Sequence, residues 1–376
     1  MIRITEKSEC CGCEACRSVC PRQCIVMKRD DEGFLYPEVA IAECIDCGLC
    51  KAVCPMRYPG EGRRPEAVFA ARNSDNALRL ASSSGGIFTR LAEQVLDRGG
   101  VVFGARFDET WNVVHSYAQS REELARFRGS KYVQSRIGDS FRQTEQFLKE
   151  GRLVLFSGTP CQIAGLRRFL RREYGNLLTV DVVCHGVPSP KVWQRYLEER
   201  TSGGAGEITG ISFRDKQHGW HEYRLSIKAG ERELASVDAD RAIYSQLYLY
   251  ELISRPSCHR CSVKGGRSGS DLTLGDFWGI ERVDPAFDDN KGCSAVLLNN
   301  PAWESLLRGI ETRQVTYEQV LQGNPALECS TKPSINRSYL FHLLRKRYTI
   351  SEIHRRCFDR SPLRRILRHL YRIFHS

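Results

Sequence analysis

Between residues 66 and 184, short continuous apolar runs alternate with amphipathic stretches. Four of the runs predict buried strands, at residues 67–72, 101–107, 152–158 and 177–184. Between them, residues 85–100, 137–151 and 159–175 carry apolar side chains at helical spacing and predict helices. Because alternating helices and strands are typical of α/β layers, we expect a partly parallel sheet.

The pattern changes on either side of this region. Residues 208–216 and 221–230 predict two strands joined around a turn, and the pattern becomes less regular beyond residue 280. We therefore expect a fold of the α+β or α/β class, organised into four parts. These are a cysteine-rich ferredoxin-like domain at 1–58, a Gly/Pro/Arg-rich linker at 59–65, a larger mixed α/β domain at 66–330 and a basic helical tail at 331–376.

The chain has 376 residues, of which 17 are cysteine. No window approaches the roughly 18 apolar residues of a membrane span, and the segment MIRITEKSEC lacks the apolar core of a secretory signal. We therefore expect a cytoplasmic protein. In that compartment a dense cysteine pattern indicates metal binding or catalysis rather than disulfide bonds.

The net charge of +11 is concentrated near the end of the sequence. Within residues 361–376, apolar side chains fall on one helical face and arginines on the other; the two sets are Leu363, Ile366, Leu367, Leu370, Tyr371 and Phe374, and Arg364, Arg365, Arg368 and Arg372. Such a helix suits peripheral contact with an anionic membrane, at the inner face here. Docking against the body or a partner subunit is the alternative. Binding of the tail to nucleic acid is the third alternative, because no recognised nucleic-acid module accompanies it.

Two cysteine runs near the N-terminus have the same spacing, C-x2-C-x2-C-x3-C-P. This is the bacterial ferredoxin pattern for two [4Fe–4S] clusters, in which the fourth cysteine of each run ligates the other cluster. The two predicted ligand sets are Cys10, Cys13, Cys16 and Cys54, and Cys44, Cys47, Cys50 and Cys20. A zinc module is the alternative, although zinc ribbons use two separated pairs of cysteines. Cys11 and Cys24 fall outside the register and are interpreted as buried thiols.

Four later cysteines are candidates for a third cluster. Cys161 and Cys184 follow predicted strands, where ligands bind in α/β sheets, and Cys258 and Cys261 form a CxxC pair. Together they would supply four thiolates. The alternative is two buried cysteines and an unrelated CxxC pair that is redox-active, zinc-binding or incidental.

A Ser/Gly segment, Ser82 to Gly86, directly precedes the helix expected at 85–100. Free N–H groups at a helix start favour phosphate, and glycine permits close backbone approach. The segment lacks the GxGxxG fingerprint of a dinucleotide-binding Rossmann fold, so that fold is not predicted. An ordinary helix cap is the alternative.

Several further motifs occur in order with these, namely SSSGGIFTRL, GSKYVQS, FSGTPCQIAGLRRFL, CHGVPSPKVW, FRDKQHGW, SCHRC and SDLTLGDFWG. In this combination the chain resembles the coenzyme F420 hydrogenase/dehydrogenase beta subunit (FrhB/FdhB) family over residues 66 to 325. The resemblance implies an FAD, iron–sulfur clusters and hydride exchange with a deazaflavin. It also favours the third cluster at Cys161, Cys184, Cys258 and Cys261.

The resemblance assigns four segments of this sequence to family motifs. Two of them would surround FAD: Ser83, Ser84, Gly85 and Gly86, and Lys131, Tyr132, Gln134 and Ser135. The third is the loop at the end of the sheet, with Thr159, Pro160, Cys161 and Gln162. The fourth is an acidic and aromatic motif, with Asp276, Phe277, Trp278 and Gly279.

In the expected mechanism, iron–sulfur clusters carry one electron at a time, and a flavin exchanges two electrons as a hydride. The protein would couple these two processes. Lys131 is the first candidate for a charge beside the flavin and His185 the second, although both also have ordinary structural interpretations. Arg214, Lys216, His218 and Trp220 could meet an anionic substrate or form a solvated hairpin tip.

Two other functions remain open. One is an electron-transfer subunit that serves a catalytic partner and performs no hydride chemistry. The other is a bacterial relative acting on a polysaccharide-pathway substrate in place of F420. For all three functions we expect a redox partner protein. For the F420-linked enzyme and for the bacterial relative we also expect a small molecule that carries hydride.

Overall fold

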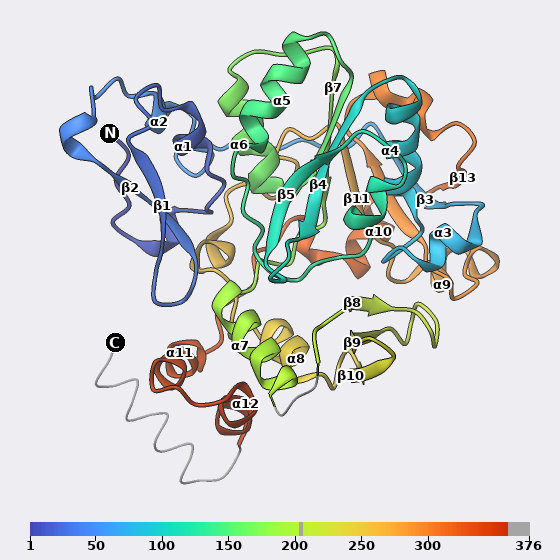
Figure 1. Cartoon of the computed structure of the whole chain (residues 1–376). Helices are drawn as coiled ribbons and strands as arrows, with labels where there is room; N and C mark the ends of the chain where they lie inside the picture. Colours follow the sequence, from blue (N-terminus) through green and yellow to red (C-terminus); the bar gives the residue numbers. More distant parts are fainter. Residues whose placement is uncertain (203–205, 360–376) are drawn as a thin grey trace.

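The computed structural model describes residues 1–202 and 206–359. It consists of a small N-terminal part beside a large sheet, with a lower layer of helices and short strands (Figure 1). The amphipathic helix expected at 361–376 lies outside the described residues. Along the described parts of the chain, no helix combines the length and apolar character needed to cross a membrane.

The main sheet of the described residues has eight strands in the order β13-β3-β12-β11-β7-β6-β4-β5. Their bounds are β3 (Ala67–Arg72), β4 (Val101–Phe107), β5 (Val113–Ala118), β6 (Val154–Gly158), β7 (Leu177–Val182), β11 (Leu272–Asp276), β12 (Ser294–Leu298) and β13 (Glu311–Gln314). Strands β4, β6, β7 and β11 pair in parallel, and the other pairings are antiparallel. This confirms the four strands predicted in residues 67–184 and the mixed α/β class.

Helices cover both faces of this sheet. Helix α4 (Ile87–Asp97) packs on one face, and α5 (Ser140–Lys149) and α6 (Pro160–Leu170) pack on the other. Side chains alternate across a strand, so Leu155 joins the α4 core whereas Val154 and Phe156 join the α5 and α6 core. Burial on both faces explains why these strands are continuous apolar runs. The three predicted helices are confirmed.

The lower layer has its own hydrophobic core, centred on Trp193 and Tyr244. It comprises α7 (Pro190–Thr201), β8 (Gly210–Asp215), β9 (Arg224–Ala229), β10 (Arg232–Asp238), α8 (Ile243–Leu249), α11 (Arg337–Arg345) and α12 (Ile350–Phe358). The strands predicted at 208–216 and 221–230 are confirmed as the antiparallel pair β8 and β9. Helices α11 and α12 lie within the expected tail, and both pack into this core.

Shorter elements connect these layers. They are α3 (Asn76–Leu80), η3 (Glu123–Phe127), η4 (Pro256–Arg260), α9 (Ile280–Val283), η5 (Pro285–Phe287), η6 (Pro301–Leu307), α10 (Tyr317–Gly323) and η7 (Pro325–Leu327).

The N-terminal part contains the antiparallel hairpin of β1 (Ile25–Arg29) and β2 (Leu35–Val39). Its helical elements are η1 (Lys7–Glu9), α1 (Ala15–Val19), η2 (Ile41–Glu43) and α2 (Leu49–Ala52). Several polar contacts tie it to the rest of the chain. Arg337 forms an ion pair with Glu32, and Lys191 Nζ donates to the Asp31 carbonyl at 2.8 Å.

Candidate active site and thiol groups

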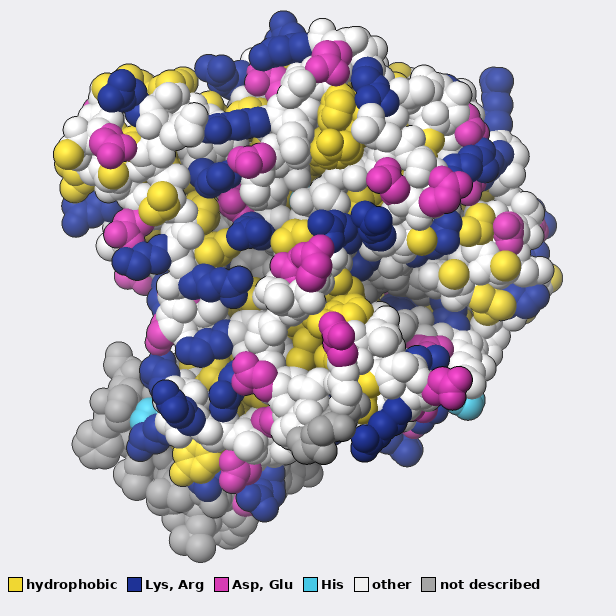
Figure 2. Space-filling view, viewed as in Figure 1, with side chains coloured by type: hydrophobic (Ala, Val, Ile, Leu, Met, Phe, Trp, Pro, Cys, Tyr) yellow, Lys and Arg dark blue, Asp and Glu magenta, His cyan; other side chains and the backbone are white. Residues whose placement is uncertain are grey.

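A cavity of about 680 Å³ opens at the carboxyl ends of the parallel strands. Gly158, Val182 and Asp276 end β6, β7 and β11 at its wall, and side chains of the lower layer close the opposite side. Figure 2 shows the molecule hollowed between these layers, with apolar side chains in the furrow. The carboxyl edge of a parallel sheet is where α/β proteins bind ligands, so this cavity is the candidate active site.

Two of the segments predicted to surround a flavin lie next to each other in this cavity. Ser83, Ser84 and Gly86 line it from the start of α4, and Lys131 and Tyr132 line it from the loop before α5. The Ser130 N–H donates to Ser83 Oγ at 2.6 Å and joins the two segments. Segments 47 residues apart in the sequence therefore form one wall.

The remaining predicted cofactor residues divide between the cavity and its surroundings. Ser135, Thr159 and Gln162 line it, and Gln162 Nε2 donates to Ser135 Oγ at 2.8 Å. Gly85 packs instead on the sheet, where an added Cβ would lie 2.5 Å from the Ala71 carbonyl oxygen. Gln134 also lies outside the lining, and its Nε2 donates to the Cys11 carbonyl at 3.0 Å.

Lys131 presents a partly buried amine to the cavity. Its Nζ donates to the carbonyls of Arg126 and Arg128 at 3.0 and 2.9 Å. Burial lowers the pKa of Lys131 to about 7. This lysine can therefore change charge near neutral pH, which suits a group that meets an anionic ligand.

His185 is more firmly anchored within the protein. Its Nε2 lies 2.5 Å from Glu251 Oε1, and its ring packs edge-on against Tyr248. His185 and Tyr248 both line the cavity, whereas Glu251 is buried behind them. Glu251 was not predicted from the sequence, because no motif links it to His185.

An ion pair between Arg214 of β8 and Asp276 at the end of β11 joins the two sides of the cavity. Nη1 and Nη2 of Arg214 lie 2.9 and 3.1 Å from the two Asp276 oxygens, and Trp220 Nε1 donates to Oδ1 at 2.9 Å. The guanidinium also stacks over the Tyr223 ring at 3.8 Å. The hairpin motif therefore contributes Arg214 to the cavity wall, and Asp276 accepts from both of its terminal nitrogens.

The other members of the hairpin motif have different environments. Lys216 Nζ is buried and donates to three carbonyls, including that of Ser84 at 2.7 Å. Trp220 is buried and stacks on Trp278, whereas His218 is exposed. A solvated tip thus describes His218 but is wrong for Arg214, Lys216 and Trp220.

The four later cysteines come together beneath the cavity, and we call them the body group: Cys161, Cys184, Cys258 and Cys261. Burial raises the pKa of the Cys184 thiol well above its usual range, and the neighbouring thiols of the group add to this effect. Burial likewise raises the pKa of Cys258 to about 12. Buried thiols that repel one another's negative charge fit a site for a positively charged metal centre.

A second thiol group combines residues from both N-terminal runs, and we call it the middle group: Cys10, Cys13, Cys16 and Cys54. Burial raises the pKa of Cys16, and Cys10 and Cys54 add to the effect. Residue Gly165 of α6 approaches this group so closely that an added Cβ would lie 2.9 Å from Cys13 Sγ. The middle group therefore faces the body of the protein.

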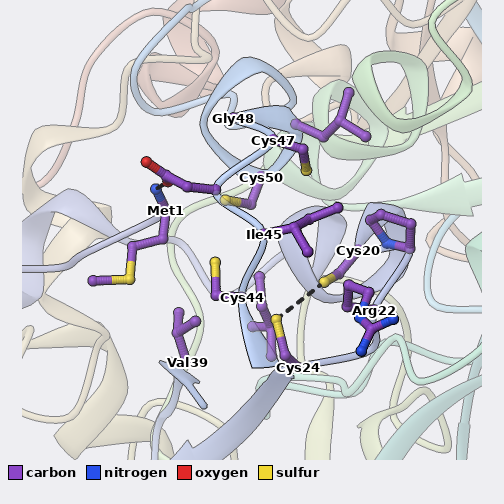
Figure 3. A pocket seen from close by; sticks show the side chains of 14 residues that line it. Met1, Cys20, Arg22, Cys24, Val39, Cys44, Ile45, Cys47, Gly48 and Cys50 are labelled. Atoms are coloured by element: carbon purple, nitrogen blue, oxygen red, sulfur yellow. Dashed lines mark hydrogen bonds and ion pairs between the residues drawn. The ribbon is translucent and has the colours of Figure 1, made fainter. Parts of the chain in front are cut away.

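The outer group contains the remaining four ferredoxin-type cysteines: Cys20, Cys44, Cys47 and Cys50. They line one small cavity, and Cys24 lines it with them (Figure 3). Cys24 Sγ lies 3.5 Å from Cys20 Sγ. The expectation that Cys11 and Cys24 are buried is confirmed.

Each N-terminal group thus combines three cysteines of one run with the last cysteine of the other. Crossed ligation of two cubane clusters stays a prediction, which the residue types present fit. Among the described residues, no three His, Cys, Asp or Glu side chains converge closely enough to hold a single metal ion. A four-iron cluster is larger than one ion, so its ligands stand farther apart.

Cys11 connects the thiol groups to one another. Its thiol contacts both Cys13 of the middle group and Cys161 of the body group. Cys184 in turn belongs to the body group and lines the cavity. The thiol-rich region thus continues from the N-terminal part to the cavity wall.

The structure thus places a ligand-sized cavity at the carboxyl edge of a mixed sheet, next to a series of thiol groups. Sequence models of one family, the beta subunit of coenzyme F420 hydrogenase/dehydrogenase, match both halves of the body. The model of the family's N-terminal region matches residues 68–140, and the model of its C-terminal region matches residues 151–322. The chain belongs to this family.

Two individual proteins are also similar. One subunit of the F(420)H(2) dehydrogenase of Methanosarcina mazei, designated F, is 25% identical over 195 residues, which cover 48% of this chain and 54% of that protein. This chain thus spans about half the length of that relative. A chain of the F420-reducing [NiFe] hydrogenase complex from Methanosarcina barkeri, solved in a xenon derivative, aligns with a TM-score of 0.48 and 17% identity, covering 72% of this chain and 91% of that one.

Proposed function

We propose that this protein is an iron–sulfur flavoprotein that couples single-electron transfer through three [4Fe–4S] clusters to hydride exchange at FAD. The hydride partner would be coenzyme F420 or a related small molecule, and the electrons would come from or go to a redox partner subunit. The observation that carries this proposal is Cys184, which belongs to the body group and also lines the cavity. A thiol shared in this way would bring the last electron carrier against the bound flavin.

The membership of the thiol groups supports one order of transfer. The outer group contains the exposed Cys47, the middle group abuts α6, and the body group adjoins the cavity. Cys50 and Cys16 interact electrostatically across the first boundary, and Cys11 bridges the second. The outer group is therefore the proposed point of exchange with the partner subunit.

The cavity residues have separate roles in this proposal. Flavin, when bound, supplies the conversion between single electrons and hydride. Ser83, Ser84 and Gly86 would hold its phosphates near the start of α4, and Lys131 would supply positive charge. Arg214 and Asp276 orient the wall that faces the substrate, and the apolar lining excludes water.

Iron and flavin contents of anaerobically purified protein test the proposal. Three clusters predict about twelve iron atoms per chain, two predict about eight, and we expect about twelve with one FAD. About eight iron atoms without flavin would contradict the hydride mechanism and leave an electron relay. A protein with about twelve iron atoms and FAD that fails to exchange hydride with F420 would redirect the search to other carriers.

Flavin affinity should fall as pH rises above about 7. Burial lowers the pKa of Lys131 to about 7, so its amine is charged below that pH and neutral above it. An anionic ligand favours the charged form, and binding above pH 7 therefore takes up a proton, which costs up to about tenfold in affinity per pH unit. Equilibrium titration of deflavinated protein with FAD between pH 6 and 8 measures this slope.

Matched variants identify the source of the slope. Lys131→Met should bind FAD more weakly at pH 6 and lose most of the pH dependence. Any slope that remains is assigned to Lys216, because burial also lowers its pKa to about 7 and its Nζ donates to the Ser84 carbonyl. Lys149→Met should retain it, because Lys149 is exposed and pairs with Glu145 within α5. His115 does not add to the slope in this range, since burial lowers its pKa to about 4. Equal slopes in the wild type and in Lys131→Met would contradict the assignment.

A further inference from the structure

Arg255 is a fully buried cation between the N-terminal part and the body. It precedes η4, the element that carries Cys258. Within the described parts of the chain, its hydrogen bonds go to neutral acceptors: Nε to the Cys10 carbonyl at 2.7 Å, Nη1 to Gln134 Oε1 at 2.9 Å and Nη2 to the Leu35 carbonyl at 2.9 Å. Its guanidinium also lies 4.3 Å from the centre of the Tyr36 ring.

This environment contrasts with that of the buried Arg79 and Arg214 and of the partly buried Arg337. Arg79 pairs with Asp289, Arg214 with Asp276 and Arg337 with Glu32. Arg255 forms no ion pair with any Asp or Glu among residues 1–202 and 206–359. A buried charge without a counter-ion is strongly destabilising, and arginine does not escape this cost by losing its proton.

The negative charge near Arg255 must therefore come from other groups. Besides Tyr36, the thiols of Cys10, Cys11, Cys161 and Cys258 interact favourably with its charge. Cys10 belongs to the middle group and Cys258 to the body group. Glycine at position 12 lets the guanidinium of Arg255 lie close to the first cysteine run. Gly12 has φ +71°, and an added Cβ there would lie 2.9 Å from Arg255 Nη1.

We propose that Arg255 is the shared counter-charge of the middle and body iron–sulfur centres and holds the reduction potentials of both above those they would otherwise have. This inference rests on the proposed function, since it requires metal centres at both thiol groups. Reduction of either centre adds one electron, supplied by the neighbouring centre, and makes or breaks no bond. The added negative charge is stabilised by the guanidinium, whose influence is strong in a buried, water-poor region.

Gln134 offers a precise way to cancel this charge. Its Oε1 already accepts from Arg255 Nη1, so Gln134→Glu would place a carboxylate where an amide oxygen now lies. The substitution preserves side-chain size and supplies the ion pair that Arg255 lacks, at the loss of the Nε2 bond to the Cys11 carbonyl. Gln134→Glu and Arg255→Gln should therefore both lower the midpoint potentials of the middle and body centres. The outer centre should shift least.

Redox titration of the full-length holoprotein, monitored by EPR, measures these potentials, with iron content determined on each sample. Arg255→Lys retains the charge and should stay closer to wild type. Arg337→Gln is the interface control: it removes a paired arginine at the same domain contact and should leave the potentials unchanged.

The outcomes separate this inference from the proposed function. Unchanged potentials in Gln134→Glu with wild-type iron content would overturn the role of Arg255. Equal shifts in Arg337→Gln would also overturn it, because a loosened interface would then explain the effect. Wild-type protein with about eight iron atoms or fewer would instead overturn the proposed set of three clusters.

Discussion

Replacing Cys54 with serine should remove about four iron atoms per chain and interrupt electron transfer, although seven of the eight ferredoxin-type cysteines remain. Cys54 ends the second cysteine run, yet its thiol interacts with Cys10, Cys13 and Cys16 of the first run. Loss of this ligand should therefore empty the middle group. Iron analysis and EPR of the dithionite-reduced protein measure the effect.

Double substitutions test the crossed membership directly. Cys16→Ser should add little to Cys54→Ser, since both residues serve the middle group, whereas Cys47→Ser should remove about four further iron atoms. Cys357→Ala, in the core of the lower layer, is a control that should retain all iron. The opposite pattern, in which Cys54 and Cys47 behave as one unit, would contradict crossed ligation. Cys20 is a weaker test, because Cys24 Sγ lies 3.5 Å away and could replace it.

Replacing Asp276 with asparagine should destabilise the protein by about 3–5 kcal/mol, because it leaves the buried Arg214 charge without its partner. Asp276 accepts from Nη1 and Nη2 of Arg214 and from Trp220 Nε1, and the neutral amide cannot supply that charge. Thermal and denaturant unfolding of the holoprotein measure the loss.

Two variants distinguish an unpaired charge from a general packing defect. Asp238→Asn removes a half-exposed partner of Arg224 and should cost less than about 1 kcal/mol. Arg214→Met combined with Asp276→Asn should recover much of the lost stability, because the buried charge is then absent. An Asp276→Asn protein as stable as Asp238→Asn would show that Arg214 finds adequate solvation elsewhere.

Local sequence patterns predicted the layers of the fold well because they report local physics. Strands β4, β6 and β7 are recognisable from continuous apolar runs, since helices bury both of their faces. Helix α4 is recognisable from its helical spacing after two glycines. Strands β11 to β13 were not predicted, because they pair with segments far apart in the chain. Strand β10 was also missed, although it pairs with the adjacent β9.

In the candidate site, too, local motifs identified residues that long-range packing then placed. Ser83, Ser84, Lys131 and Cys184 were identified from motifs, and all of them line the cavity. Gln134 belongs to the same motif as Lys131, but it lies beside Cys11 and Arg255. Neighbouring residues on an extended backbone point in opposite directions, so a motif alone does not assign each side chain to one wall.

The sequence by itself determined the types of chemistry available: the cysteine spacing, the Ser/Gly helix start and the apolar pattern of the main sheet. Only the tertiary structure decided which groups meet. The Arg214–Asp276 pair joins residues 62 apart, and the buried Arg255 contacts a carbonyl 245 residues away. Spacing along a chain constrains local geometry, whereas the charge balance of a buried group depends on every segment packed around it.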